Sequence, residues 1–293
     1  MIRLRFFLLL FCFPFLSYSQ TVCDLESKKR IEGIGAKFQG SDYKSLPTGD
    51  LITAIGNQFL GTPYVGKTLE LPGEEQLVIN LMEVDCTTFV EAVLALTITI
   101  KQGAADFQKV AETLEHMRYL NGSNTGYGSR LHYFSDWIFE NEKAGRLIHL
   151  SKSLGGIKST NTPSFMSANP NSYSQLANPK NLFSIQEREV ILASREMYFI
   201  PKEKIHLIED QLQNGDILAI TTTIKNLDVV HAGFAVKQGE RIYLMHASSV
   251  SKKVMISSIP LQEYLMQNHS QTGILVSRLL PPSPKEFGKI GIL

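Results

Sequence analysis

The chain has 293 residues, of which 43% are hydrophobic and 19% are charged, and its formal net charge is +1. This composition predicts an ordinary globular protein with enough apolar residues for a sizeable core. The near-zero charge gives no electrostatic attraction to nucleic acid or to anionic lipid, so neither is an expected partner.

The first twenty residues, MIRLRFFLLLFCFPFLSYSQ, have the layout of a secretory signal peptide: two arginines, an apolar run and small residues near Ser19. Eleven apolar residues interrupted by Pro14 are too few to span a bilayer, so no stable membrane insertion is expected. We expect residues 1–19 to be removed and the mature chain to be periplasmic or secreted. Its net charge is then near −1, because two of the 29 basic residues leave against 28 acidic ones (27 − 28).

Export changes the interpretation of the cysteines. Cys12 leaves with the signal peptide, which leaves Cys23 and Cys86. Secreted proteins that depend on disulfides tend to carry several in even sets, although a single bridge between these two cysteines remains an alternative. Lipidation of Cys23 is disfavoured by Val22, where a small residue would be expected. An isolated thiol at Cys86 therefore favours a chemical role.

The mature chain, residues 20–293, contains no internal repeat and predicts a single domain. Its N-terminal third is predicted to be helical. A first helix is expected within residues 49–64, where apolar residues recur four apart before the breakers Gly61 and Pro63.

A second helix is predicted to begin at Cys86, with Asp85 as its N-cap. Apolar residues recur along it at helical spacing, at Phe89, Val93, Leu96 and Ile100. This wide apolar surface predicts a buried helix. A third, amphipathic helix is expected at residues 105–120, before a turn-forming segment.

Residues 120–210 are predicted to form an insertion of polar loops and short helical pieces. A helix is expected at 133–145, and residues 159–181, rich in Ser, Asn and Pro, are expected to form a surface loop. A further helix is predicted to start at Ser184, which has a glutamate three residues later, and to stop at Pro201.

After this insertion the pattern changes to short runs that are mostly rich in β-branched and aromatic residues. Strands are predicted at residues 215–224, 229–238, 241–249, 253–259 and 273–280. Their short connections predict mostly antiparallel neighbours. Helices followed by a sheet indicate an α+β domain.

Cys86 could be a nucleophile or a small core residue. A helix N-terminus lowers the pKa of a thiol through its dipole and its unpaired N–H groups. The charge of Asp85 would oppose this ionisation slightly, so Asp85 is assigned a capping role.

A cysteine nucleophile also needs a base, and the base needs a partner that orients it. The candidates are His116, His132, His149, His206, His231, His246 and His269. If residues 229–249 form a tight hairpin, His231 and His246 lie at the same end of adjacent strands. Zinc is the weaker interpretation of this pair, because no third ligand stands close by, so no metal or cofactor is predicted. His116, His149, His206 and His269 are interpreted as ordinary surface residues.

Six motifs, in chain order, resemble an exported bacterial family of N-acetylmuramoyl-L-alanine amidase-like proteins, a branch of the NlpC-type papain-like cell-wall hydrolases. The motifs are GTPY, DCTTFVEAVLALT, YGSRLHYFSDWI, GDILAI, HAGFAV and HASS. The resemblance covers roughly residues 50–280 and is most specific in DCTTFVE and SRLHYFSDWI. It implies a papain-like α+β fold, in which the nucleophile helix packs on a C-terminal, mostly antiparallel sheet.

The resemblance also implies roles for individual residues. Cys86 would be the nucleophile, His231 the general base and His246 the residue that orients it. Tyr64 would bind substrate or the developing oxyanion, unless it only packs at a helix end, and Arg130 would pair with a substrate carboxylate.

Asp85 is grouped with Tyr64 and Arg130 as an expected substrate-binding residue. His132 is expected to have a structural, hydrogen-bonded role, and Tyr133, Phe134 and Trp137 are expected to pack in the core.

The function that follows is an amide hydrolase of peptidoglycan or muropeptides. It would cleave either the N-acetylmuramoyl-L-alanine amide or a stem-peptide bond through a thioester. An acyltransferase or transglutaminase-like enzyme on the same Cys-His-His site, or a non-catalytic cell-wall binder, remains an alternative. The sequence leaves the oligomeric state open.

Overall fold

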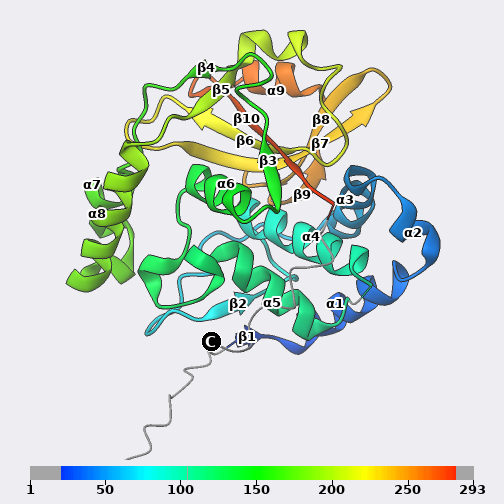
Figure 1. Ribbon diagram of the computed structural model, residues 1–293, viewed down its shortest axis with the longest axis horizontal. Coiled ribbons are helices and arrows are strands. Elements are labelled where there is room, and N and C mark those ends of the chain that lie inside the picture. Colours follow the sequence, from blue (N-terminus) through cyan, green and yellow to red (C-terminus); the bar gives the residue numbers. More distant parts are fainter. Residues whose placement is uncertain (1–20, 104, 282–293) are drawn as a thin grey trace, which may run out of the picture.

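The computed structural model describes residues 21–103 and 105–281, which form a layer of helices packed against a sheet (Figure 1). The predicted signal peptide lies outside the described residues. Within the described part of the chain, no helix is long and apolar enough to cross a membrane.

The sheet has eight strands in the order β4-β5-β10-β6-β7-β8-β9, with β3 also paired to β10, and every pairing in it is antiparallel. The strands are β3 (Leu147–His149), β4 (Ile157–Lys158), β5 (Tyr198–Pro201), β6 (Ile217–Thr222), β7 (Val229–Gln238), β8 (Arg241–Ser248), β9 (Lys253–Ile256) and β10 (Gln271–Leu279). A small parallel sheet joins β1 (Thr21–Cys23) to β2 (Leu77–Ile79). The five strands predicted from the sequence are all present. Strands β1 to β5 were not predicted from the sequence.

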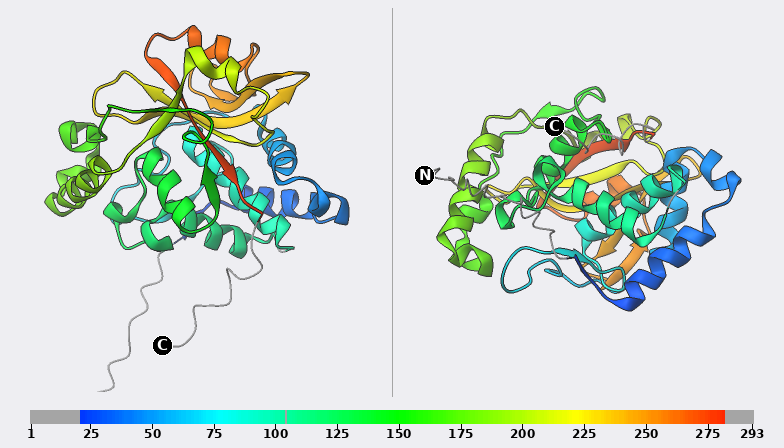
Figure 2. Two further views of the ribbon diagram at one scale, coloured as in Figure 1. Left: turned by 45° about the horizontal axis from the view of Figure 1, so that its top comes forward. Right: turned by 60° about the horizontal axis from the view of Figure 1, so that its bottom comes forward.

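The helices lie mainly on one face of the large sheet. They are α1 (Leu25–Lys37), α2 (Ser41–Ser45), α3 (Thr48–Gly56), α4 (Cys86–Lys101), α5 (Phe107–Arg118), α6 (Phe134–Lys143), α7 (Phe165–Ala168), α8 (Pro179–Ala193) and α9 (Leu261–Met266). Short 3-10 turns occur at Asn57–Phe59, Leu120–Gly122, Tyr127–Ser129, Pro170–Ser172, Ser174–Ala177 and Lys202–Leu207. Figure 2 shows α7 and α8 at one end of the molecule and α1 and α2 at the other. The mixed α+β class predicted from the sequence is confirmed.

Helix α4 is the central helix of the core and packs against β7 and β8. Every residue from Thr88 to Ile100 is buried, as the broad apolar surface of this segment predicts. A second apolar cluster, which includes Leu261 and Leu265 of α9, covers the other face of the sheet. Strands of the sheet therefore sit between two apolar layers, which fixes their position relative to α4.

The insertion differs from the prediction at two places. Helix α8 begins at Pro179, with the side chain of Asn178 accepting a hydrogen bond from the Lys180 N–H, so Ser184 lies inside the helix. Asparagine at the N-cap followed by proline at the first helical position is a strong start signal, which overrides the spacing at Ser184. The expected surface loop at 159–181 contains α7 and two 3-10 turns.

The end of that predicted helix is also wrong, because residues 198–201 form β5 instead of continuing α8. Gly273 of β10 lies so close to this strand that an added Cβ would be 2.0 Å from the carbonyl oxygen of Ile200. Pairing with the sheet therefore decides the conformation of this segment, which helical periodicity alone could not reveal.

Candidate active site

Cys86 is the first residue of α4, and its neighbours fix the position of the helix start. The Asp85 carboxylate accepts a hydrogen bond of 2.8 Å from the Thr88 N–H, while the Asp85 N–H donates to the Thr88 hydroxyl at 2.9 Å. Val84 is bonded through its backbone to the segment that carries Tyr64. The predicted helix start and N-cap are confirmed.

His231 and His246 meet at the end of the β7–β8 hairpin. Nε2 of His231 and Nδ1 of His246 share a hydrogen bond of 2.6 Å, and the two rings are nearly perpendicular at 86°. The hairpin connection is tight, since Gln238 pairs directly with Arg241. The predicted meeting of these two histidines is therefore confirmed.

Gly233 allows β8 to approach β7 closely beside the histidine pair. An added Cβ at this position would lie 2.5 Å from the carbonyl oxygen of Met245 and 3.0 Å from the Cβ of His246. No side chain fits there without moving β8. The glycine in HAGFAV is therefore required sterically, because it lets the strand that carries His246 lie against the strand that carries His231.

The thiol and His231 come together in one cavity. Cys86 and His231 both line it, and the Ala232 N–H, one residue after His231, hydrogen-bonds to the Cys86 sulfur. A register shift between β6 and β7 lies directly before His231. Such a bulge re-aims the side chains near it, here directly before His231 in β7.

Burial controls the ionisation of this pair. Burial raises the pKa of Cys86 to about 11, and the negative charge of Asp85 raises it further, against smaller lowering by hydrogen bonds from Ala232 and Thr87. Burial lowers the pKa of His231 to about 3, with a contribution from His246, and burial lowers that of His246 to about 4. Thiol and imidazole are both neutral at neutral pH. The lowered thiol pKa expected from the helix N-terminus is wrong, because desolvation outweighs the helix dipole.

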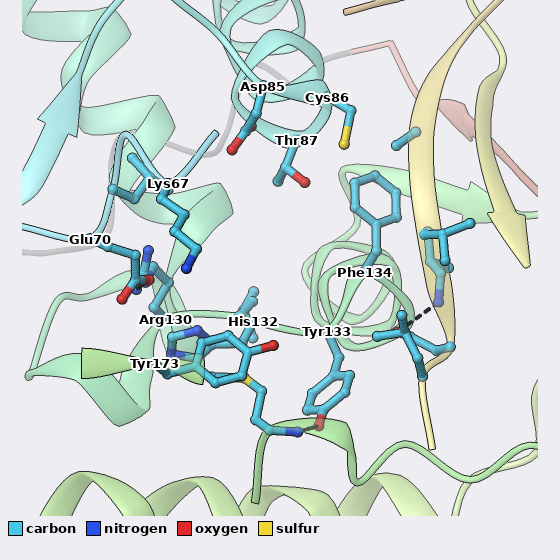
Figure 3. A pocket seen from close by; sticks show the side chains of 18 of the residues that line it. Lys67, Glu70, Asp85, Cys86, Thr87, Arg130, His132, Tyr133, Phe134 and Tyr173 are labelled. Carbon is cyan, nitrogen blue, oxygen red and sulfur yellow. Dashed lines mark hydrogen bonds and ion pairs between the residues drawn. The ribbon is translucent and has the colours of Figure 1, made fainter. Parts of the chain in front are cut away.

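The cavity has a volume of about 320 Å³. Figure 3 shows Cys86 on one side and Lys67, Glu70, Arg130 and Tyr173 on the other. We call the side formed by Cys86, Thr87 and His231 the thiol wall. The side formed by Lys67, Glu70, Arg130 and Tyr173 is the opposite wall.

Tyr64 lies next to the thiol wall but does not line the cavity. Its phenol is half-buried, and burial together with the charges of Cys86 and Asp85 raises its pKa to about 12. The hydroxyl is therefore protonated at neutral pH and able to donate a hydrogen bond. The backbone hydrogen bond from the Val84 N–H to the carbonyl oxygen of Pro63 brings the segment that carries Tyr64 beside the start of α4, which is the neighbourhood the sequence indicates.

Arg130 lines the cavity, but protein carboxylates already hold its guanidinium. It is paired with Glu70 and lies 3.2 Å from an oxygen of Glu75. Its guanidinium also stacks over the Tyr127 ring at 5.0 Å from the centroid. These contacts make Arg130 a structural tie within the opposite wall, and a substrate carboxylate would have to compete with two internal ones.

The aromatic cluster beside Arg130 also takes part in the cavity. His132 shares a hydrogen bond of 2.8 Å between its Nε2 and the carbonyl oxygen of Tyr127. Burial and the nearby Arg130 hold its pKa well below the usual value, so the ring is neutral. Tyr133 and Phe134 are buried as expected, yet both line the cavity as well.

Three further charged residues line the cavity, and the sequence did not identify them as part of the site: Asp228, Glu91 and Arg118. Asp228 directly precedes β7, the strand that carries His231, and accepts a hydrogen bond of 2.8 Å from the Ser135 N–H at the start of α6. Glu91 and Arg118 are joined by a 2.8 Å ion pair. Glu91 follows Cys86 by five residues on the same helix, and its place in an apolar sequence was the one signal that could have identified it.

The remaining cysteine and histidines lie elsewhere. Cys23 and Cys86 are both free thiols, so the alternative of a bridge between them is wrong. Cys23 lies in β1, where it is the strand partner of Ile79 of β2. His116, His149, His206 and His269 do not line this cavity. Across residues 21–103 and 105–281, no group of three or more His, Cys, Asp or Glu side chains could hold a metal ion.

Comparison with known proteins finds a family model that matches most of the chain. The model of a family described as AmiA-like, N-acetylmuramoyl-L-alanine amidase-like, matches residues 54–274. A crystal structure of an N-acetylmuramoyl-L-alanine amidase from Bacteroides uniformis is 40% identical with a TM-score of 0.75, and the match covers 79% of this chain and 98% of that one.

Two other solved structures are similar. A Bacteroides fragilis protein provisionally named a xylanase is 38% identical, with a TM-score of 0.73 and coverage of 77% of this chain and 100% of that one. A Legionella pneumophila protein is 22% identical with a TM-score of 0.67, and the match covers 88% of this chain and 96% of that one. At this identity the similarity indicates a shared fold only. No curated protein matches the chain.

Proposed function

The chain belongs to the N-acetylmuramoyl-L-alanine amidase-like family, and on that premise we propose that it is a cysteine-dependent amide hydrolase of peptidoglycan or muropeptides. The observation that carries the proposal is the cavity that Cys86 and His231 both line, with His246 bonded to Nε2 of His231 at 2.6 Å. This set of groups is the one that an NlpC-type, papain-like hydrolase uses. The papain-like classification is part of the proposal.

The first step is attack by sulfur on the substrate amide carbonyl. Thiol and imidazole start neutral, so Nδ1 of His231 takes the thiol proton as the carbon–sulfur bond forms. His246 accepts from Nε2 of His231 and stabilises the imidazolium. The N–H of Cys86, which has no partner within its helix, and the Tyr64 hydroxyl stabilise the oxyanion.

The second step releases the amine. The imidazolium of His231 gives its proton to the leaving nitrogen as the carbon–nitrogen bond breaks, which leaves a thioester on Cys86. The same imidazole then takes a proton from water as the water attacks the thioester. Collapse of that adduct returns the proton to sulfur and releases a carboxylic acid.

Two amide bonds fit this chemistry. The family name supports the bond between N-acetylmuramic acid and L-alanine, and a bond within the stem peptide is the second choice. The signal-peptide layout of residues 1–19 supports a periplasmic or secreted location, where both bonds occur.

Glycosidase chemistry, which the provisional xylanase name of one similar structure suggests, has less support. It needs a pair of carboxyl groups with separate acid and base or nucleophile roles. The four acidic side chains of the cavity are each engaged: Glu70 with Arg130, Glu91 with Arg118, Asp85 with the start of α4, and Asp228 with Ser135.

The proposal is tested by digesting muropeptides with wild type, Cys86→Ala and Cys86→Ser and analysing the products by mass spectrometry. We expect both variants to lose cleavage while they keep the wild-type melting temperature. Cleavage at the wild-type rate by either variant would exclude the nucleophile. Parallel reactions with added amine distinguish hydrolysis from acyl transfer, because a transferase forms a new amide.

A further inference from the structure

The cationic side chains of the cavity are each paired with a carboxylate, with one exception. Arg118 is paired with Glu91, and Arg130 is paired with Glu70 and Glu75. Lys67 lines the same cavity and has no carboxylate partner within the described residues. The one hydrogen bond that its ammonium group makes there is with the carbonyl oxygen of Ser172, at 3.4 Å.

Lys67 is held in place by its loop. Its backbone adopts φ of +64°, a left-handed conformation that is uncommon for a residue with a side chain. The loop is tied to the insertion by Gln175, whose amide nitrogen donates to the carbonyl oxygens of Leu71 at 2.6 Å and Gly73 at 3.1 Å. These contacts fix the backbone of the loop, and the Lys67 side chain lies across the cavity from Cys86 (Figure 3).

The two halves of the proposed substrate differ in charge. N-acetylmuramic acid uses its carboxyl group in the scissile amide, so the sugar half has no free carboxylate. The stem peptide carries free carboxylates on its acidic residue and at its C-terminus. A free ammonium group pairs strongly with a carboxylate through a charge-assisted hydrogen bond.

We infer that Lys67 and the adjacent Tyr173 form a subsite for a free carboxylate of the stem peptide, so that the leaving, peptide half of the substrate lies on the opposite wall. This inference rests on the proposed function. His132 supports it, because its ring lines the cavity with Nε2 bonded to Tyr127, which leaves Nδ1 as an acceptor for a peptide N–H.

The test compares two muropeptides that differ at one group: the second stem residue is D-glutamate with a free carboxylate, or D-isoglutamine with a carboxamide. Wild type, Lys67→Met and Lys67→Arg are assayed on both compounds. Lys152→Met is the matched control, because its ammonium group stacks on Tyr198 and does not line the cavity.

We expect wild type to prefer the acid over the amide by about tenfold in kcat/KM. Lys67→Met should lose this preference through KM on the acid, with little change on the amide, and Lys67→Arg should restore part of it. Lys152→Met should keep the wild-type preference. An equal loss on both compounds, or a preference that survives Lys67→Met, would overturn the inference.

Binding separates this inference from the proposed function. Calorimetry with Cys86→Ala and with Cys86→Ala/Lys67→Met measures the affinity for both compounds without turnover. If wild type cleaves neither compound but Cys86→Ala binds the acid more tightly in a Lys67-dependent manner, the proposed function fails and the subsite stands. If wild type cleaves both compounds equally well, the hydrolase stands and the subsite fails.

Discussion

The two walls of the cavity are built in different ways. The thiol wall stands on regular structure, with Cys86 at the start of α4 and His231 on β7, and the backbone hydrogen bonds of helix and sheet fix both. The opposite wall is assembled from a loop and the insertion, joined by side-chain contacts such as that of Gln175 with Leu71. The groups proposed for chemistry thus have a rigid framework, and those proposed for selectivity depend on a few polar ties.

Substitution of Gly233 should have the largest effect on the thiol wall. In Gly233→Ala the new Cβ would overlap the carbonyl oxygen of Met245, so β8 must move and take His246 away from His231. We expect activity to fall by more than roughly 1,000-fold and the free energy of unfolding to fall by about 1–3 kcal/mol.

Muropeptide assays and denaturant unfolding measure the two effects of Gly233→Ala. Gly33→Ala is the matched control, because an added Cβ there meets nothing within 4 Å. Wild-type activity in Gly233→Ala would show that close approach of the strands is unnecessary for the site.

Removal of the orienting ring should come next in size. His246→Ala leaves His231 in place but removes its 2.6 Å partner. We expect kcat to fall roughly 100- to 1,000-fold with KM nearly unchanged, because orientation of the base matters in the transition state. His149→Ala is the control, since His149 is bonded to Ser151 outside the cavity. A change in KM alone would contradict the orienting role.

The buried histidines should also make stability depend on pH. The folded pKa values of His231 and His246, about 3 and about 4, lie below the ordinary value of 6.5. The unfolded chain therefore binds more protons between pH 6.5 and these values, so stability is fully present above pH 6.5 and is lost as pH falls. Each histidine contributes about 1.4 kcal/mol per pH unit in this window.

Urea unfolding at pH 4, 5, 6 and 7 measures this slope, with His246→Gln as the comparison. A glutamine cannot titrate, so the variant should show a shallower slope. Equal slopes in the two proteins would show that other groups produce the dependence.

Loosening the opposite wall should have the smallest effect. Gln175→Ala removes the hydrogen bonds to Leu71 and Gly73 that tie the loop carrying Lys67 to the insertion. We expect KM to rise about three- to tenfold with kcat unchanged, which corresponds to the loss of roughly one hydrogen bond. Gln108→Ala, on the exposed surface, is the control. A larger fall in kcat would show that the two walls are coupled.

The thiol wall could largely be predicted from the sequence. The start of α4 follows from Asp85 and the apolar spacing after it, and the meeting of His231 with His246 follows from a tight hairpin. The neutral state of Cys86 could not be predicted, because its desolvation depends on chains of residues packed from distant segments.

The opposite wall was mostly beyond prediction. Lys67 meets Ser172, and Gln175 meets Leu71, across about one hundred residues of sequence. Contacts of this kind leave no periodic pattern. Arg130 was identified as part of the site, but its internal partners Glu70 and Glu75 were not, since nothing in the spacing of these residues indicates that they meet.

The position of β10 determines when the large sheet can finish folding. The last strand of the sheet, Gln271–Leu279, lies between β5 and β6 and also pairs with β3. A growing chain that lacks these residues exposes unpaired strand edges in the middle of its sheet. The sheet therefore closes only after the residues of β10 have been synthesised, and a protein shortened before residue 271 would have to leave those edges open to other chains.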